Sequence, residues 1–505
     1  MRREVDFAIN LHFACQMTIG ATLATAAAFD PGKAAFVMEE KSMSYAEADA
    51  ASNQFANALL SKGAAPGDNI AVIGHNSIEY AISYFGIARA GCASLHLSPR
   101  MTGKELEYCL KGGNVRLTIC DPDIPAIDID VRVSLETEQF DQFLEGSSVA
   151  DPGLEPSIDS PSSATYTGGT TGFPKGGMHT ARSRLAWATI AQEFFNLTPQ
   201  EVMANAAPMG HAAGGFIWFQ PGVCAGATQV LLRHWSTKDF VQAVERETVT
   251  STFLVPTQIQ MLLDSDDFDS TRLQSIKKIV YGGAPAPDGL IERASGALTH
   301  CEFIQNYGMT EIGPLITLYK DDRKVFPSAI GRHTRHTDCA IFTPSAKKAA
   351  VGEIGELCFR GPTLMTGYVD DPKQTDEFFR HGDGWGWTGD LAVINKKGVI
   401  TLAGRSKDMI ISGGLNIYPA EIECVFNELL VVKECAVFGV PDEKFGELPA
   451  IAVVTENKIT ADEILYLCEK KLARHKRPRR IEFVHKLPKS PAGKVLRTVL
   501  RNRFK

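Results

Sequence analysis

The sequence predicts an α/β fold with a parallel, doubly wound sheet, followed by a smaller unit. The first observation is an alternation of short apolar runs with helical patterns that begins at Asn69. The second is a change near Gly331 to short apolar runs separated by Gly, Pro and charged residues, as in antiparallel strands. The third is a distinct stretch after Arg405 that ends in a basic tail. At 505 residues, the chain exceeds the size of one core, so two or more units are expected.

The first alternation contains three short runs that we interpret as buried strands: IAVIG, CASLHL and VRLTIC. Between them, Ser77 to Ala90 and Met101 to Leu110 have the pattern of helices, with Asn76 or Ser77 as the cap of the first and Gly91 as its stop. Ligands in such sheets bind beyond the carboxyl ends of the strands.

The stretch YTGGTTGFPKGG, from Tyr166 to Gly177, is the strongest candidate for a phosphate site. Glycines can turn successive backbone amides toward an anion, threonines add hydroxyl donors, and Lys175 adds a positive charge. The loop residues are Gly168, Gly169, Thr170, Thr171 and Gly172. The loop is not a Walker A motif, because Pro174 precedes the lysine and Gly176 follows it. Taken alone, the stretch is also compatible with a flexible surface turn.

A short strand before this loop and a helix from about Ala181 to Phe195 after it predict a strand, loop and helix. The alternation then resumes with VMANAAPM, TQVLLR, STFLVP, IKKIVYGG and EFIQNYG as strands, and with a helix from Ser236 to Glu247.

The last hundred residues read as a separate unit. Pro419 stands at the first turn of a helix, and Thr460 with Glu463 forms a capping box. The tail HKRPRRIEFVHKLPKSPAGKVLR is strongly basic. It is either a solvated face or a surface that binds a phosphorylated ligand.

Four further stretches carry side chains suited to nucleotide chemistry. QNYGMTE offers an aromatic ring, a hydroxyl and a carboxylate, which can stack a base and hold a divalent cation. GWGWTGD ends in an acid that can accept two ribose hydroxyls. GRSKDMIISGGLNIYP places charges at the domain joint with glycines after them, and KSPAGK presents a lysine on a loop. Singly, each stretch has an ordinary structural explanation, but their joint occurrence in this order does not.

Together these motifs resemble the adenylate-forming superfamily of acyl-CoA synthetases, nonribosomal-peptide adenylation domains and firefly-type luciferases. The resemblance covers nearly the whole chain from about Met43, and the commoner phosphate loop has Ser where Gly168 stands. It implies a large domain over residues 1–405, with two doubly wound sheets and a small distorted β-barrel. It also implies a small mobile α+β lid domain over residues 406–505.

The resemblance assigns expected roles to individual residues. The phosphate loop would act through Thr167, Gly168, Gly169, Thr170, Thr171, Gly172 and Lys175. Adenine would be flanked by Gly283, Ala284, Pro285 and Tyr307, with Asn306, Gly308 and Met309 alongside. Thr310 would touch the α-phosphate, Glu311 and Thr170 would hold Mg²⁺, and His211 would gate the acyl site. Asp390 and Arg405 would bind the ribose hydroxyls, and Lys407 would lie at the hinge between the domains. Gly413 and Gly414 would line the pantetheine channel, and Lys494 would be the catalytic lysine.

The implied reaction joins a carboxylic acid to CoA through an acyl-adenylate, using ATP, Mg²⁺ and coenzyme A. The segment AAGGFIWFQ after His211 is small and apolar and lacks the acid that amino-acid-activating relatives use, so a medium-chain or aryl acid is favoured. Asn306 would shorten the pocket or bind a substrate oxygen. The alternatives are an enzyme that loads a carrier protein, a luciferase-like oxygenase, and a nucleotide sensor without catalysis.

Composition limits the partners to small molecules. A net charge of −7 and a pI near 6.0 give no general attraction to nucleic acid or anionic membranes. Eleven scattered cysteines argue against a disulfide framework or a zinc cluster, so a reduced, cytoplasmic location is expected. The chain has no apolar run long enough to span a membrane. A monomer and a homodimer both remain open, and the segment before Met43 has no assigned role.

Overall fold

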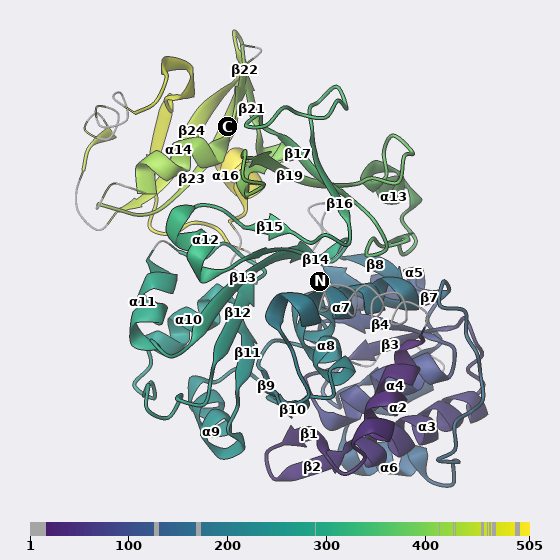
Figure 1. Cartoon of the computed structure of the whole chain (residues 1–505). Helices are drawn as coiled ribbons and strands as arrows, with labels where there is room; N and C mark the ends of the chain where they lie inside the picture. Colours follow the sequence, from purple (N-terminus) through teal and green to yellow (C-terminus); the bar gives the residue numbers. More distant parts are fainter. Residues whose placement is uncertain are drawn as a thin grey trace. The chain divides into compact units, whose positions relative to one another are not determined.

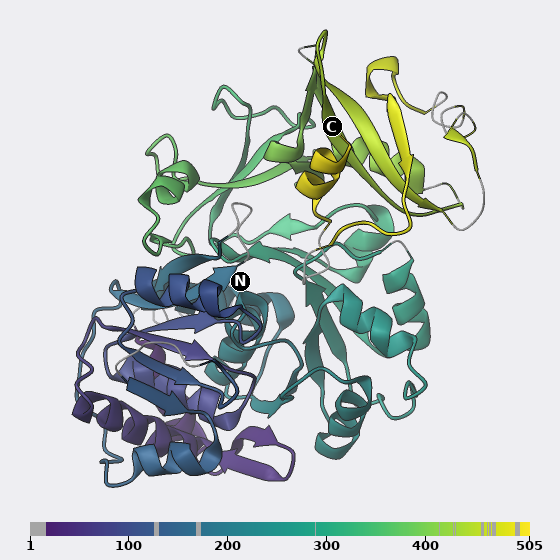
Figure 2. The same cartoon turned by 180° about the vertical axis from the view of Figure 1, so that it is seen from behind.

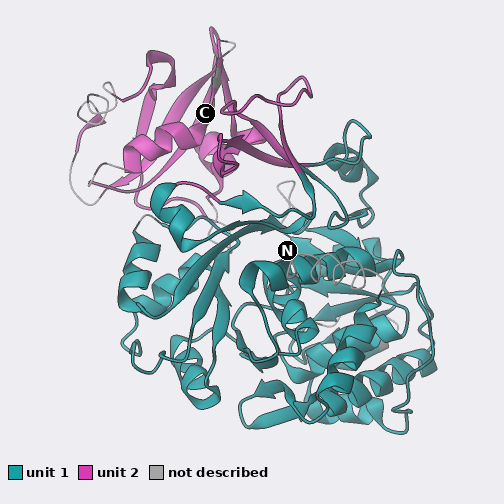
Figure 3. Cartoon of the chain, in the orientation of Figure 1, with its two compact units in different colours: residues 1–327, 331–338, 359–386 teal, residues 328–330, 339–358, 387–505 magenta. Residues whose placement is uncertain are grey.

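The computed structural model describes residues 17–125, 131–167, 173–287, 289–413, 415–427, 429, 431–455, 459–461, 463, 466, 471–489 and 495–504. The chain divides into two compact units (Figure 3). Unit 1 comprises residues 1–327, 331–338 and 359–386, and unit 2 comprises residues 328–330, 339–358 and 387–505. The domain boundary predicted between residues 405 and 406 stays a prediction.

Within the described residues, unit 1 is built on two large sheets (Figure 1). The nine-stranded sheet has the order β15 (Arg332–His333), β14 (Gly313–Leu318), β13 (Glu302–Met309), β12 (Lys278–Gly282), β11 (Ser251–Leu254), β9 (Val202–Asn205), β10 (Thr228–Leu231), β1 (Ala34–Met38) and β2 (Lys41–Ser44). The seven-stranded sheet has the order β18 (Gly367–Tyr368), β8 (Lys175–Thr180), β7 (Pro161–Thr167), β4 (Ala93–Leu97), β3 (Asn69–Ile73), β5 (Leu117–Cys120) and β6 (Val131–Ser134). The strands from β1 to β13 in the first sheet and from β7 to β6 in the second pair in parallel.

Helices connect the parallel strands and cover the sheets, as Figure 2 shows from behind. They are α2 (Ile19–Phe29), α3 (Tyr45–Ser61), α4 (Ile78–Arg89), α5 (Gly103–Gly112), α6 (Thr137–Leu144), α7 (Ala181–Phe195), the π-helix η1 (Ala212–Phe219), α8 (Gln220–Cys224), α9 (Thr237–Glu247), α10 (Pro256–Leu263), α11 (Leu290–Ala297), α12 (Lys320–Val325) and α13 (Pro372–Phe378). Ser77 caps α4 by accepting a hydrogen bond from the Tyr80 amide, and Ser236 caps α9 in the same way from Asp239.

Strand β3 is apolar along its whole length because both of its faces are buried. Ile70 and Val72 join the core cluster that contains α3 and α4, whereas Ala71 and Ile73 pack with α5 on the other face. Alternate residues of a strand point to opposite faces, so both faces are buried. The first cluster also contains α7, η1 and residues of β9 and β11, so one layer of helices packs against both large sheets.

Unit 2 contains a five-stranded sheet with helices on both faces. Its strands are β22 (Leu415–Ile417), β21 (Ile410–Ser412), β24 (Gly446–Thr455) and β23 (Val432–Asp442), and β25 (Arg480–Phe483) pairs with β24. On one face, α14 (Pro419–Asn427) packs against Val437 and Ile451, and on the other α16 (Arg497–Arg503) packs against Ala436 and Phe438. Short helical turns lie at η2 (Ser406–Asp408) and η3 (Arg474–Lys476).

A four-stranded sheet stands where the sequence predicts a small barrel: β16 (Asp338–Phe342), β17 (Gly355–Arg360), β19 (Gly386–Ile394) and β20 (Ile400–Arg405). The boundary between the units passes within β16, β17 and β19. The predicted fold class, α/β with several sheets and a smaller C-terminal part, is confirmed. The capping box of Thr460 and Glu463 is also present. Among the described helices, none is both long and apolar enough to cross a membrane.

Candidate active site

The phosphate-loop motif connects two antiparallel strands. Strand β7 ends at Thr167 and β8 begins at Lys175, and these two residues are partners in the ladder. Gly168, Gly169, Thr170, Thr171 and Gly172 lie outside the described residues. The sequence predicts a strand, loop and helix, but the structure inserts β8 before α7, because KGGMHT pairs along the edge of β7.

Lys175 and Glu311 approach the same tyrosine. The Lys175 ammonium donates to Gln374 Oε1 at 2.5 Å and lies 5.6 Å from the centre of the Tyr368 ring. The Tyr368 hydroxyl donates to Glu311 Oε1 at 2.6 Å. Tyr368 is placed there by β18, which pairs with β8. The lysine predicted to bind phosphate and the carboxylate predicted to bind metal therefore belong to one site.

Thr310 is fixed beside this pair by a buried histidine. One ring nitrogen of His179 lies 2.7 Å from the Thr310 carbonyl oxygen, and the other lies 3.0 Å from Ser183 Oγ. Burial, then the positive charge of Arg184, lowers the pKa of His179, so the ring is neutral and donates one proton. Thr310 and Glu311 are themselves buried. Sequence reasoning missed His179, Tyr368 and Gln374, since an isolated residue in a short strand or a short helix gives no local signal.

The residues predicted to flank adenine lie at the ends of two parallel strands. Gly283 follows β12 with a φ of +79°, where glycine is favoured, and Ala284 and Pro285 come next. Gly282 pairs with Asn306, and a Cβ at Gly282 would lie 2.2 Å from the Asn306 carbonyl oxygen. The loop after β12 therefore starts beside the strand that carries Tyr307.

Asn306, Gly308 and Met309 belong to β13, close to β14. The Asn306 amide donates to the Ile316 carbonyl at 3.1 Å, which uses part of its polar capacity within the sheet. Gly308 lies at an irregularity in the ladder, and a Cβ there would meet the Gly313 carbonyl oxygen at 2.2 Å. This close approach requires glycine.

His211 is the residue immediately before the π-helix η1. Its side chain is exposed, but desolvation by surrounding protein, then Arg100, lowers its pKa, so its ring is neutral near pH 7. Gly214 and Gly215 are needed here, because Cβ atoms would lie 2.2 Å from the Pro208 and Met209 carbonyl oxygens. The sequence does not predict this π-helix, a rare form that is frequently found at functional sites.

In unit 2, the two residues predicted to bind ribose are adjacent. Asp390 on β19 and Arg405 on β20 are ladder partners, and Arg405 Nε lies 2.5 Å from Asp390 Oδ1. Lys407 lies in η2. Gly413 has a φ of +58°, and its amide donates to the Phe445 carbonyl at 2.8 Å. Gly414 and Lys494 lie outside the described residues.

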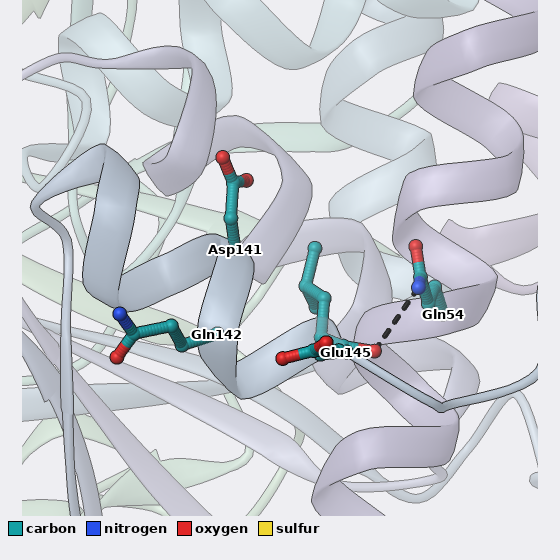
Figure 4. A pocket seen from close by; sticks show the side chains of 5 residues that line it. Gln54, Asp141, Gln142 and Glu145 are labelled. Carbon is teal, nitrogen blue, oxygen red and sulfur yellow. Dashed lines mark hydrogen bonds between the residues drawn. The ribbon is translucent and has the colours of Figure 1, made fainter.

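A separate hollow lies between α3 and α6 (Figure 4). It is lined by Gln54, Asp141, Gln142, Leu144 and Glu145, and the Gln54 amide donates to the Leu144 carbonyl at 3.0 Å. None of the predicted site residues lines it, and its acidic lining does not suit an anionic nucleotide.

Comparison with known proteins identifies the family. The family model described as AMP-binding enzyme matches residues 23–369, and the model of the AMP-binding enzyme C-terminal domain matches residues 421–494. The match therefore begins before Met43, the point from which the resemblance was recognised in the sequence.

Relatives and solved structures agree with this match. A feruloyl-CoA synthase from Amycolatopsis sp is 33% identical over 468 residues, which cover 92% of this chain and 94% of the relative. A fatty acid–[acyl-carrier-protein] ligase from Streptomyces coeruleorubidus is 30% identical and covers 98% of both chains. The crystal structure of ATP-bound MatB from Rhodopseudomonas palustris superposes with a TM-score of 0.88 and 29% identity, covering 97% of this chain and 99% of that one. The chain therefore belongs to the AMP-binding enzyme family, the adenylate-forming superfamily that its motifs predict.

Proposed function

We propose that this protein is an ATP-dependent carboxylic acid:CoA ligase that forms an acyl-CoA through an acyl-adenylate, with release of pyrophosphate and AMP. The observation that carries the proposal is the meeting of Lys175 and Glu311 at Tyr368, beside Thr310. This arrangement combines a cation, a carboxylate and a hydroxyl at the ends of β8 and β13. Proteins that are at least 30% identical to this chain over most of their length include CoA ligases.

The first half-reaction joins the acid to AMP. A carboxylate oxygen of the acid attacks the α-phosphorus of ATP, and the bond from that phosphorus to the pyrophosphate oxygen breaks. Both reactants are anions, so catalysis depends mainly on positioning and on neutralising charge. Lys175 stabilises the phosphates that leave, and the hydroxyl of Thr310 contacts the α-phosphate.

The second half-reaction transfers the acyl group to sulfur. The thiol sulfur of CoA, as thiolate, attacks the acyl carbon, and the bond from that carbon to the AMP oxygen breaks. His211 borders the acyl site. Because its ring is neutral, it places no charge on the path by which the CoA thiol approaches. The Gly413 turn contributes to the pantetheine channel.

The side chain of Glu311 fits a magnesium ion. Mg²⁺ prefers oxygen ligands and is usually held by one or two carboxylates together with substrate phosphates. Among the described residues there is no group of three His, Cys, Asp or Glu suited to a metal, so the protein's share would be Glu311, with Thr170 as a further ligand. When bound, the ion neutralises charge on the phosphates. The Tyr368 hydroxyl orients the Glu311 carboxylate.

The acid is proposed to be a medium-chain fatty or aryl acid, because η1 supplies apolar and aromatic side chains after His211. The thiol that accepts the acyl group could belong to a carrier protein bearing phosphopantetheine instead of to CoA, because one relative is a ligase of that kind. Purified protein should be tested for acid-dependent ATP–pyrophosphate exchange, and then for thioester formation with free CoA and with a phosphopantetheinyl carrier protein. Exchange without transfer to CoA, but with transfer to the carrier, would select the alternative.

Two substitutions test the assigned roles. Lys494→Ala should abolish pyrophosphate exchange but spare thioester formation from preformed acyl-adenylate, and equal loss of both would contradict the role of Lys494. Glu311→Gln should lower the exchange rate by about a hundredfold or more and raise the Mg²⁺ concentration needed. An unchanged Mg²⁺ titration would argue against Glu311 as a ligand.

A further inference from the structure

Arg184 is a fully buried arginine. It lies in α7, four residues after the Thr180 cap, and its exposed fraction is 0%. Its Nε donates to Ser163 Oγ at 2.7 Å and one Nη donates to Thr165 Oγ1 at 3.3 Å. The other Nη has no hydrogen-bond partner within the part of the chain that the structure describes. Among the described residues, no Asp or Glu pairs with this guanidinium, and burial lowers its pKa to about 9.

Aromatic rings hold the guanidinium in place. Its central carbon lies 3.7 Å from the centre of the Phe216 ring and 4.5 Å from that of Trp187. Cation–π contacts offset part of the cost of burying the charge, but they leave the donors of Nη1 unsatisfied. Ser163 and Thr165 serve the other two nitrogens, so among the described residues Nη1 alone lacks an oxygen acceptor.

A second unsatisfied donor, on Gln220, is connected to Phe216 through Tyr84. Tyr84 makes an edge contact with Phe216, with ring centres 5.7 Å apart, and its hydroxyl donates to Gln220 Oε1 at 3.0 Å. The Gln220 side-chain amide nitrogen is buried, and no described residue accepts a hydrogen bond from it. Arg184 and Gln220, from α7 and α8, form what we call the buried donor pair.

Arg184 contacts the segment after His211, which the sequence assigns to the acyl pocket, and reaches the Thr310 motif through Trp187. Phe216 belongs to η1, which follows His211. Trp187 packs so closely on Gly313, near the end of the Thr310 motif, that a Cβ there would lie 2.5 Å from the indole nitrogen. His179, which holds the Thr310 carbonyl, makes an edge contact with Trp187, with ring centres 4.7 Å apart. Two side chains, Trp187 and His179, therefore lie between Arg184 and Thr310 at the reacting end of the site.

We infer that Arg184, with Gln220, selects acids that carry an oxygen acceptor at the end remote from the reacting carboxylate. This inference rests on the proposed ligase function and narrows its substrate class. A distal carboxylate is the strongest partner, because it would accept from Nη1 and also balance the positive charge. A hydroxyl, ether or ketone oxygen would satisfy the hydrogen bonds alone. An acid with a plain hydrocarbon end would leave the buried donors unpaired.

The test compares matched acids on the full-length enzyme. Straight-chain and aryl acids would each be supplied with a hydrocarbon end, a neutral oxygen and a distal carboxylate, and kcat/KM for pyrophosphate release would be measured. The proteins are the wild type, Arg184→Met and Arg184→Lys. The control is Arg182→Met, which removes a half-exposed arginine on the same helix that pairs with Asp159.

The wild type should prefer an oxygen-bearing acid in at least one set, by about a hundredfold or more, because a site built to hydrogen-bond a group rejects analogues without it. Arg184→Met should lose most of that preference while keeping activity on the hydrocarbon acid, Arg184→Lys should retain part of it, and Arg182→Met should retain all of it. A carboxylate and a neutral oxygen are distinguished by which member of the set the wild type prefers.

Two results would overturn the inference while leaving the ligase intact: a wild-type preference for the hydrocarbon acid in every set, or an equal loss on all acids in Arg184→Met. In the second case a lowered melting temperature would identify Arg184 as structural only. Absence of exchange with every acid would reject both this inference and the proposed function.

Discussion

Unit 1 contains a buried ion pair whose two charges are well satisfied and a buried arginine whose charge is not. Glu201 and Lys278 form an ion pair at 2.7 Å, with only 11% of each side chain exposed. Thr250 and Ser251 also donate to Glu201, and Lys278 donates to two backbone carbonyls, of Phe195 and Asn196. Arg184 is more deeply buried, yet it contacts two hydroxyls and two rings and keeps one Nη unpaired.

The difference separates a structural charge from a functional one. Removing a charge from water is costly, and a well-paired group recovers that cost inside the folded chain. A group with an unsatisfied donor recovers the rest of that cost when a partner arrives from outside. Orphaned donors in a core therefore indicate a ligand more strongly than paired ones do. The predictions below test this contrast between the paired and the unpaired charge.

Glu201→Gln should have the largest effect on stability. The variant leaves Lys278 charged and buried, so the free energy of unfolding should fall by roughly 3 to 5 kcal/mol. Burial acts to raise the pKa of Glu201, but hydrogen bonds from Lys278, Thr250 and Ser251 outweigh it and lower the pKa below 4.5.

The ionised carboxylate therefore contributes its stability above about pH 4.5, and this contribution is lost as pH falls through the lower folded pKa. Urea unfolding of both proteins, from pH 8 down to well below the ordinary carboxyl pKa, measures the difference. A difference that does not shrink at low pH would contradict the assigned ion pair.

Gly313→Ala should have the next largest effect, because it disturbs the ring on which Arg184 stacks. Gly313 has a φ of +87°, and its new Cβ would collide with Trp187. A loss of about 1 to 3 kcal/mol in the free energy of unfolding is expected from such overpacking. Gly63→Ala is the matched control, since its φ is +88° and nothing lies within 4 Å of its Cβ position. Equal losses in both variants would mean that Trp187 moves aside freely.

Arg184→Met should make the protein more stable, by roughly 1 kcal/mol, since replacing buried charge by an apolar side chain of similar size is often neutral or stabilising. Burial lowers the pKa of Arg184 to about 9, so the cost of its charge is present at neutral pH and recedes as pH rises above that value. Thermal unfolding at pH 7 and pH 10 should show the larger gain at pH 7. A large loss of stability at pH 7 would mean that the arginine is structural.

Asp264→Asn should have the smallest effect and sets the baseline. Asp264 and Arg293 form a pair at 2.8 Å, but about half of each side chain is exposed. Solvent screens such pairs, so the unfolding midpoint should not change measurably. A clear shift would show that pairing matters in this protein even without burial.

The sequence correctly predicts features whose chemistry lies within a few residues. The Ser77 cap, helix α7 over Ala181–Phe195 and the box of Thr460 and Glu463 all follow from hydrogen bonds between near neighbours. Sequence motifs also identify the family. The assignments of Lys494, the phosphate-loop glycines and the ribose pair stay predictions, because they concern ligands.

Contacts between distant segments were not predictable in the same way. Tyr368 reaches Glu311 only because β18 pairs with β8, and His179 holds Thr310 only because β8 of one sheet lies beside the end of β13 of the other. The π-helix depends on the approach of the Pro208 and Met209 carbonyls to two glycines, which no local propensity encodes.

Arg182 and Arg184 show where the limit lies. In the sequence they are two similar residues near the start of one helix, and the sequence determines that helix. Two residues along a helix turn the side chain by about 200°, so one faces outward and pairs with Asp159, whereas the other faces β7 and Phe216. Only the packing of β7 and η1 around α7 decided that Arg184 would be buried without a carboxylate, because a charge acquires its partner from the whole fold.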